Sequence, residues 1–474
     1  MRLVRVCAFA VSSTNVPGEK KIGSGRALET FATALCTNPK CKSMTRRSPV
    51  SLDHPDRHQL QNHQAQRLGQ LVAAVVPANP FWTKKFAAAG CRPEDLQTLA
   101  DLSRLPTTQK KELIDDQIAA PPYGTNLTER VSRFCRLHQT SGTTSTPLRW
   151  LDTPASWEWV TSCWRQIFEI TQTTADDVVA FPFSFGPFLG FWAAFDAASR
   201  LGALCLPAGG LTSQARLQMI RDNRASVMCC TPTYALRLAE VAEEEGIDLS
   251  GSTVRSIIVA GEPGGSVQAV RASIEKSWGA RVSDHWGMTE VGPLAVECLE
   301  NPGGLHILET ECIAEIVDPG SQQPVAPGTQ GELVITNLGR TGSPLFRYRT
   351  GDLVLADTDS CPCGRHLLRL KGGILGRLDD MVTIRGNNVF PSSIEGILRE
   401  FPQIAEYRID VETRRSMQHI KISIEPHATV HSATLLEDVG HAIRDRLHFQ
   451  AEIVEIPPGQ LPRFELKSRR FFRT

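Results

Sequence analysis

Between Ser226 and Val259 the chain reads SVMCCTPTYALRLAEVAEEEGIDLSGSTVRSIIV. A short apolar run, Ser226–Cys230, is followed by a segment long enough for a crossover helix, Thr233–Glu245, and then by a second apolar run, Ser256–Val259. Strand, helix and strand in this order are typical of a βαβ unit, in which the two strands lie parallel in one sheet. This stretch therefore predicts an α/β fold.

The same alternation extends to both sides of this stretch. It predicts further strands at Val178–Phe181, Ala203–Pro207 and Arg281–His285. It also predicts crossover helices at Gly190–Leu201, Ser213–Asp222 and Ser266–Trp278. Repeated βαβ units form a largely parallel sheet, and ligands of such sheets gather at the carboxyl ends of the strands. We therefore expect a ligand site where these strands end.

The spacing of apolar residues and of glycine and proline turns divides the chain into three parts. Residues 1–50 precede the first segment of helical spacing, His58–Val76, and we expect them to be a disordered extension or the product of a misassigned start. Residues 51–376 are predicted to form a large domain that ends in a β-rich subdomain, where strands are joined by glycine and proline turns. Residues 377–474 alternate strands and helices again, which predicts a small α+β domain.

Composition limits the classes of partner. The 474 residues exceed the size at which a single core usually keeps growing, in agreement with several domains. Lysine plus arginine equals aspartate plus glutamate, 51 against 51, so no basic excess favours nucleic acid or an anionic membrane. No apolar stretch reaches the roughly 20 residues that span a bilayer. Thirteen cysteines, an odd number without regular spacing, indicate reduced thiols and hence a cytoplasmic protein. The expected partners are small molecules, with no nucleic acid and no membrane.

A loop rich in hydroxyl groups, Gln139–Pro147, reads QTSGTTSTP. Ser141, Gly142, Thr143 and Thr144 offer successive backbone N–H groups with hydroxyls beside them, a donor surface suited to polyphosphate oxygens. The Gly-Lys-Ser/Thr ending of the usual P-loop is absent. Taken alone, such a run is also compatible with an ordinary surface turn. The interpretation as a phosphate loop therefore depends on the segments that follow it.

Four further segments follow this loop in order. They are Val259–Pro263 (VAGEP), Asp284–Val291 (DHWGMTEV), Phe346–Leu353 (FRYRTGDL) and Gly376–Pro391 (GRLDDMVTIRGNNVFP). Together with the loop they resemble the motifs of adenylate-forming enzymes, the superfamily of acyl-CoA synthetases, firefly luciferase and peptide-synthetase adenylation domains. The closest resemblance is to the phenylacetate-CoA ligase family, and it runs from about residue 60 to the end. It implies an ATP-dependent acid–CoA ligase that forms an acyl-AMP and pyrophosphate, and then an acyl-CoA and AMP.

The resemblance implies a set of residues around the nucleotide. These are Ser141, Gly142, Thr143, Thr144, Gly261, Glu262, Pro263, Asp284, His285, Trp286, Asp352 and Arg377. Trp286 would offer a flat face for adenine, with Gly261–Pro263 as the opposite wall. Asp352 and Arg377 would bind the ribose. Thr289 and Glu290 would contact the phosphate and Mg²⁺, for which a carboxylate is a preferred hard oxygen ligand.

The resemblance also implies roles for the C-terminal part of the chain. Lys467 corresponds to a lysine that neutralises charge between the acyl carboxylate and the α-phosphate, so the implied catalytic residues are Lys467, Thr289 and Glu290. A solvated basic tail is the alternative for Lys467. Asp379 corresponds to the hinge about which the small domain rotates between the two half-reactions, and Gly386 to a residue that lines the pantetheine tunnel.

The sequence departs from the family pattern near two of these motifs. Ser145 stands where the family loop has a second glycine and no lysine follows Pro147, so ATP affinity or rate is expected to differ. Leu466 replaces the glycine that precedes the family lysine. The acid pocket is expected at Phe181–Phe188 and Gly209–Gly210, whose aromatic rings suit a flat aryl group. Core packing explains any single phenylalanine there equally well.

A separate group of residues has the chemistry of a metal site. Cys298 and His306 form a C-x7-H pair, and Cys361 and Cys363 form a C-x-C pair. Thiolate and imidazole are the ligands of a tetrahedral structural Zn²⁺. Unrelated reduced cysteines are the alternative, and the sequence leaves the two interpretations open.

These observations predict an α/β protein whose large domain carries a small α+β domain on a hinge. Its predicted function is the ATP-, Mg²⁺- and coenzyme A-dependent activation of an aryl acid such as phenylacetate, and relatives of this type are often homodimers. Two alternatives remain: an adenylating enzyme that passes the acyl group to an acceptor other than coenzyme A, or a nucleotide-binding homologue without catalysis.

Overall fold

The computed structural model describes residues 54–473, with gaps at 141–145, 385–386, 415–416, 428–433 and 465–466. The predicted extension at residues 1–50 lies outside the described residues. So do the residues of the predicted phosphate loop, Ser141, Gly142, Thr143, Thr144 and Ser145, together with Gly386 and Leu466.

Three helices open the described chain: α1 (Arg57–Val75), α2 (Pro80–Ala88) and α3 (Lys110–Ala119). Helix α1 begins at Asp56, whose carboxylate accepts a hydrogen bond from the backbone of Gln59 while the Gln59 side chain bonds back to the cap. Apolar residues spaced three and four apart then bury one face of the helix. Short 3-10 turns lie at Pro93–Asp95, Leu99–Arg104, Val131–Arg133 and Leu378–Asp380.

The centre of the fold is an eight-stranded sheet with the order β13-β9-β8-β7-β6-β5-β3-β4. Five strands are parallel: β3 (Val178–Phe181), β4 (Leu204–Pro207), β5 (Val227–Cys230), β6 (Ser256–Ala260) and β7 (Arg281–Met288). Three antiparallel strands extend it: β8 (Gly292–Val296), β9 (Gly304–Ile307) and β13 (Arg369–Lys371). The largely parallel sheet expected from the sequence is therefore the parallel part of a mixed sheet.

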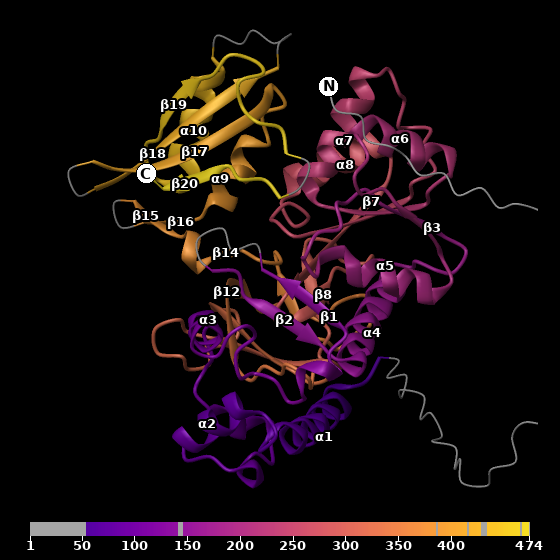
Figure 1. The fold of residues 1–474 in the computed structure, drawn as a ribbon. Helices are drawn as coiled ribbons and strands as arrows, with labels where there is room; N and C mark the ends of the chain where they lie inside the picture. Colours follow the sequence, from indigo (N-terminus) through magenta and orange to yellow (C-terminus); the bar gives the residue numbers. More distant parts are fainter. Residues whose placement is uncertain are drawn as a thin grey trace, which may run out of the picture. The chain divides into compact units, whose positions relative to one another are not determined.

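Helices cover both faces of this sheet (Figure 1). They are α4 (Pro154–Ile170) and α5 (Gly190–Leu201) on one face, and α6 (Ser213–Asp222), α7 (Pro232–Glu244) and α8 (Gln268–Trp278) on the other. Successive side chains of a strand point to opposite faces. Accordingly, Val227 and Cys229 join the core under α4 and α5, while Met228 and Cys230 join the core under α6–α8. A strand buried on both faces explains the continuous apolar run that the sequence shows there.

A second, antiparallel sheet has the order β10-β11-β12-β14. Its strands are β10 (Cys312–Val317), β11 (Gln330–Asn337), β12 (Tyr348–Leu355) and β14 (Gly376–Arg377). The antiparallel sheet from β10 to β14 is the β-rich region that the sequence predicts at the end of the large domain. Strands β1 (Arg136–Gln139) and β2 (Arg149–Asp152) pair separately, before and after the predicted phosphate loop in the chain.

The C-terminal segment, orange to yellow in Figure 1, has a hydrophobic core of its own, which includes Ile394, Tyr407 and Val439. A four-stranded sheet has the order β19-β18-β17-β20. The elements of the whole C-terminal segment are β15 (Val382–Ile384), β16 (Asn387–Val389), α9 (Pro391–Leu398), β17 (Ile404–Arg414), β18 (Met417–Pro426), α10 (Leu435–Leu447), β19 (Glu452–Glu455) and β20 (Phe471–Arg473). The predicted boundary between residues 376 and 377 stays a prediction.

Two strands carry candidate site residues. Strand β7 is longer than the predicted Arg281–His285 and continues through Trp286 to Met288, and Asp352 lies within β12. Strands β8, β9 and β13 were not predicted, since they are short and have glycines or prolines nearby. Among the described residues, no helix has the length and apolarity needed to cross a membrane.

Candidate active site

Trp286, Asp352 and Arg377 form one hydrogen-bonded group. The indole Nε1 of Trp286 donates to Asp352 Oδ2 at 2.9 Å, and Arg377 Nη1 donates to Asp352 Oδ1 at 2.9 Å. Burial of the Asp352 carboxyl raises its pKa to about 6, although the charge of Arg377 and the hydrogen bond from Trp286 favour the charged form. Three residues from β7, β12 and β14, far apart in the sequence, thus meet around one carboxylate.

Glu290 lies close to this group. Its side chain is buried, Lys110 Nζ lies 3.0 Å from its Oε1, and the Tyr348 hydroxyl donates to the same oxygen at 3.3 Å. Thr289, the preceding residue, is half-buried. A buried carboxylate with a lysine beside it suits a site that binds a charged ligand or a cation. Lys110 was not predicted as a site residue, because nothing in its local sequence indicates proximity to Glu290.

Arg340 holds the backbone of this segment. Its side chain is fully buried and pairs with the equally buried Asp152 through two hydrogen bonds of 2.7 and 2.6 Å. The same guanidinium donates to the carbonyl oxygens of Thr289 and Glu290 at 2.6 and 3.1 Å. Arg340 therefore connects β2 to the turn after β7. No sequence pattern indicates this role of Arg340, since Asp152 and Arg340 are 188 positions apart.

Lys467 approaches from the C-terminal segment. Its Cε lies 3.1 Å from the position that a Cβ on Gly261 would occupy, and Gly261 has a φ of +96°, which favours glycine. Lys467 itself remains accessible to solvent. The protein around it nevertheless lowers the pKa of its ammonium group, mainly by desolvation, whereas the charges of Glu262 and Glu290 raise that pKa. The structure thus places Lys467 beside Gly261, and the next residue, Ser468, is bound to Glu262.

Other predicted residues lie elsewhere or make other contacts. His285 is buried, with Nδ1 2.7 Å from the Ala295 carbonyl and its ring 4.5 Å from that of Trp164, and burial lowers its pKa to about 4. Asp284 accepts a 2.5 Å hydrogen bond from Ser266, and its pKa is raised to about 7, chiefly by desolvation. The Asp379 side chain is 82% exposed.

The stretch expected to line an acid pocket contains a cluster of aromatic rings. Phe183 lies 5.4 Å from Phe191 and Phe185 lies 4.6 Å from Trp192, measured between ring centroids in edge-to-face arrangements. A Cβ on Gly209 would lie 3.2 Å from the Phe185 ring, so the glycine allows close approach to that ring. Phe183, Phe185 and Trp192 are only partly buried, which leaves aromatic surface for a further group.

The four predicted metal ligands are brought together. The candidate ligand atoms of Cys298, His306, Cys361 and Cys363 all lie within 4.8 Å of one another. The Cys298 and Cys361 sulfurs are 3.6 Å apart, and Cys363 Sγ is 3.5 Å from His306 Nε2. Cys298 follows β8, His306 lies on β9, and the two remaining cysteines lie in the turn between β12 and β13. Proximity of all four is an observation that the sequence could not supply.

Comparison with known proteins assigns the chain to a family. The AMP-binding enzyme family matches residues 73–340, and the AMP-binding enzyme C-terminal domain matches residues 386–474. The chain belongs to the AMP-binding enzyme family. It is 30% identical to the phenylacetate-coenzyme A ligase of Thermus thermophilus over 86% of this chain and 95% of that protein. It is 32% identical to the Escherichia coli phenylacetate-coenzyme A ligase over 90% and 97%.

Among AMP-binding enzymes of known structure, 2-hydroxyisobutyryl-CoA ligase is similar throughout. In the postadenylation state, in complex with R3-HIB-AMP, it has a TM-score of 0.84 at 30% identity and covers 89% of this chain and 91% of its own. In the thioesterification state, with 2-HIB-AMP and CoA, the TM-score is 0.68 at the same identity and coverage. These findings confirm the predicted α/β fold class and identify an adenylate-forming acid–CoA ligase of the phenylacetate-CoA ligase type.

Proposed function

We propose that this ligase activates an aryl acid such as phenylacetate. The acid attacks the α-phosphorus of ATP to form an acyl-AMP and release pyrophosphate, and the sulfur of coenzyme A then displaces AMP. The partly buried rings of Phe183, Phe185 and Trp192 support an aryl substrate, because aromatic groups favour offset and edge contacts. The phenylacetate-coenzyme A ligases that are 30% and 32% identical to this chain support it as well.

The nucleotide would bind at the group formed by Trp286, Asp352 and Arg377. In this proposal Trp286 faces adenine, while Asp352 and Arg377 hold the ribose hydroxyls. The Ser141–Thr144 loop, together with Thr289, would bind the phosphates. Glu290 is the candidate ligand for Mg²⁺, since its buried carboxylate is a hard oxygen donor whose charge is partly balanced by Lys110. Magnesium would neutralise the polyphosphate, and Lys110 would separate from Glu290 when the cation binds.

Lys467 would act on the reacting groups themselves. An ammonium group on a flexible stem can stabilise the negative charge that develops between the acyl carboxylate and the α-phosphate. Asp379 would serve as the hinge, and Gly386 would line the path of the pantetheine arm. The observation that carries the proposed function is the approach of Lys467 to Gly261, the residue before Glu262, whose carboxylate accepts a hydrogen bond from Ser468.

A panel of acids tests this function. Purified protein is supplied with ATP, Mg²⁺ and phenylacetate, benzoate, 2-hydroxyisobutyrate, acetate or hexanoate, and pyrophosphate release is measured with and without coenzyme A. We expect phenylacetate or benzoate to be the best substrate and coenzyme A to be required for continued turnover. Preference for an alkyl acid would contradict the aryl assignment. Pyrophosphate exchange that coenzyme A does not convert to turnover would indicate another acyl acceptor, and the absence of exchange with every acid would contradict catalysis.

A homodimer stays a prediction from the resemblance.

We also propose that Cys298, His306, Cys361 and Cys363 bind a structural Zn²⁺. Zinc–sulfur bonds of about 2.3 Å in a tetrahedron place two sulfurs roughly 3.8 Å apart. The observed 3.6 Å between Cys298 and Cys361 is close to that separation. Four protein ligands would leave no open position for a substrate, so the role is structural.

Metal analysis tests the zinc proposal without any activity measurement. We expect about one zinc per chain in the wild-type protein and a large loss in Cys363→Ser. Cys205→Ser is the matched control, since Cys205 is half-buried on β4 and outside the group of four. Equal zinc content in wild type and Cys363→Ser would contradict the assignment.

A further inference from the structure

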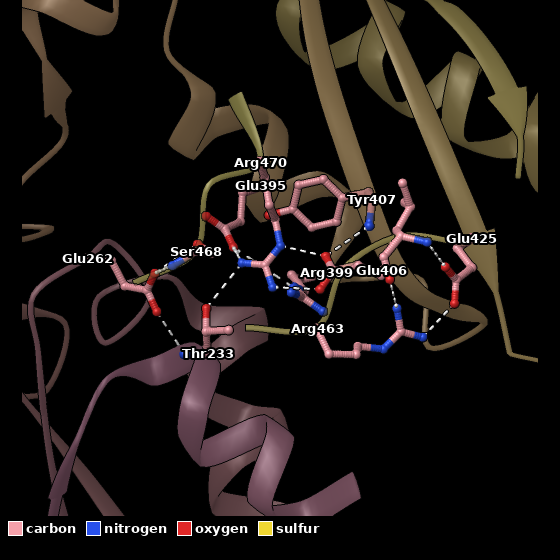
Figure 2. Close-up of polar contacts among 11 residues, drawn as sticks. Thr233, Glu262, Glu395, Arg399, Glu406, Tyr407, Glu425, Arg463, Ser468 and Arg470 are labelled. Carbon is pink, nitrogen blue, oxygen red and sulfur yellow. Dashed lines mark hydrogen bonds and ion pairs between the residues drawn. The ribbon is translucent and has the colours of Figure 1, made fainter. Parts of the chain in front are cut away.

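The segment that carries Lys467 is hydrogen-bonded to the AMP-binding part of the chain at two points (Figure 2). The first is Glu262, which follows β6. Its Oε2 accepts hydrogen bonds from the backbone N–H and the hydroxyl of Ser468 at 2.7 and 2.8 Å. Its Oε1 accepts from the backbone N–H of Thr233 at 3.0 Å, in the first turn of α7. One carboxylate thus joins a helix N-terminus, where negative charge is favourable, to the residue directly after Lys467.

The second point is Arg470, which is buried. Its Nη1 donates to the Thr233 hydroxyl at 3.1 Å. Its Nε and Nη2 donate to the two carboxylate oxygens of Glu406 on β17 at 2.5 and 2.9 Å. The guanidinium also lies over the rings of Tyr407 and Phe464, each centroid 5.2 Å away. Arg470 is therefore fixed within the C-terminal segment, and its Nη1, which also lies 3.9 Å from Glu395 Oε1, donates to Thr233.

The chain beyond Arg470 is anchored as well. The Arg470 carbonyl accepts a hydrogen bond from Ile409 N at 2.7 Å, and β20 then pairs in parallel with β17. Residues 468–470 consequently connect the C-terminal sheet to the first turn of α7. Lys467 lies immediately before them, with its side chain along Gly261.

We propose that Glu262, Ser468, Thr233 and Arg470 form a latch that positions Lys467 for adenylate formation. We call these four residues the latch. The inference rests on the proposed function of Lys467 and adds a role that the resemblance did not imply, since Glu262 was predicted only as part of the adenine wall. Two of the latch contacts, Ser468 with Glu262 and Arg470 with Thr233, join residues of the AMP-binding match to residues of the C-terminal match. Rotation of the C-terminal part for thioester formation would have to break them.

The latch therefore acts on one half-reaction. Its hydrogen bonds favour the arrangement in which Lys467 reaches the carboxylate and α-phosphate. Because they would be absent in the thioester-forming arrangement, their loss removes nothing from that step. Glu262 and Arg470 are positioning residues in this account, and Lys467 is the catalytic residue.

Substitutions of the latch test it through the two half-reactions measured separately. Adenylate formation is followed as ATP–pyrophosphate exchange with the most active acid of the panel, and thioester formation as the conversion of supplied acyl-AMP and coenzyme A. We expect Thr233→Val and Ser468→Ala each to lower the exchange kcat by about threefold to tenfold, the usual effect of losing one hydrogen bond. Thioester formation should stay within about twofold of wild type.

Two controls distinguish positioning from general damage. Thr233→Ser keeps the hydroxyl and should restore exchange, whereas Glu400→Gln removes an exposed ion pair with Arg446 and should leave both half-reactions unchanged. An equal fall of both half-reactions in Thr233→Val, or no fall in exchange, overturns the proposal.

Hydrogen exchange of the C-terminal peptide tests the latch independently of catalysis. The Ser468 amide is donated to Glu262, so Glu262→Ala should speed deuterium uptake in the peptide that contains residues 467–471. Unchanged uptake would overturn the latch even in an active enzyme. If deuterium uptake is faster in Glu262→Ala but the wild-type protein shows no pyrophosphate exchange, the contact between Glu262 and Ser468 is supported and only the proposed function is refuted.

Discussion

Asp352 is a residue at which burial and the proposed role act against each other. The carboxylate must be charged to accept hydrogen bonds from ribose hydroxyls, yet burial raises its pKa to about 6. Arg377 and Trp286 donate hydrogen bonds to the charged carboxylate and so oppose part of this rise in pKa. A buried acid in such surroundings titrates close to neutral pH.

The affinity for adenosine should therefore fall as the pH is lowered. Below the pKa of about 6, Asp352 is protonated and loses acceptor capacity, so affinity should fall about tenfold from pH 7 to pH 5 and level off at higher pH. Adenosine is the ligand of choice because it has no phosphate that titrates in this range. Calorimetric titration at several pH values measures the effect. Asp352→Asn should bind weakly at every pH, and a flat wild-type profile would refute the role of this carboxylate.

Individual site residues were predictable to different extents. Trp286, Asp352, Arg377 and Lys467 were found because they stand in motifs whose order is readable in the chain. The contacts among Trp286, Asp352 and Arg377 depend on three strands that only the fold brings together, and the approach of Lys467 to Gly261 depends on the placement of the C-terminal segment. Lys110 could not be predicted, since its significance comes entirely from the 3.0 Å approach to Glu290.

At the level of elements, the buried Asp152–Arg340 pair fixes the end of β2 against the turn that carries Thr289 and Glu290. Both side chains are fully buried. Removing one partner of such a pair leaves the other charge without compensation, which typically costs about 3–5 kcal/mol.

We expect Arg340→Met to lower the free energy of unfolding by several kcal/mol. The substitution leaves Asp152 buried without the guanidinium, beside a His138 ring whose pKa is lowered to about 4, and it also frees the carbonyls of Thr289 and Glu290. Denaturant unfolding followed by tryptophan fluorescence measures the loss. Asp152→Asn combined with Arg340→Met should be less harmful than Arg340→Met alone, because no unpaired charge remains. A single variant as stable as wild type would show that this pair does not stabilise the turn.

The proposed zinc ion would connect other elements, namely the loop after β8, strand β9 and the turn before β13. Chelation should lower Tm in wild-type protein, because a bound metal stabilises only the folded state. The same treatment should not change the Tm of Cys363→Ser. Differential scanning calorimetry with and without chelator measures both values, and an unchanged wild-type Tm would argue against a structural metal.

The predictability of elements follows from their patterns. The parallel strands and crossover helices were readable because βαβ units give long, regular alternation. Strand β5 is an example, with apolar side chains toward two separate cores. Strand β9 was missed because Gly304–Ile307 is four residues long and follows a glycine and proline turn. Its place is fixed by pairing with β8 and β13.

For the whole molecule, the contacts between the AMP-binding part and the C-terminal part decide which step the enzyme is ready to perform. The fold is more similar to the postadenylation state of 2-hydroxyisobutyryl-CoA ligase than to its thioesterification state. In agreement, Lys467 lies along Gly261 and Ser468 is bound to Glu262. The sequence predicted a mobile C-terminal domain by resemblance, but the arrangement of its contacts required the structure.

Separate measurement of the two half-reactions in Lys467→Ala tests the central claim most directly. We expect pyrophosphate exchange to fall by at least about 100-fold, the usual effect of removing one group that stabilises transition-state charge, while thioester formation from supplied acyl-AMP is retained. Arg469→Ala, an exposed basic residue of the same segment, should leave both steps intact. Equal loss of both half-reactions in Lys467→Ala, or full exchange activity in it, would contradict the account.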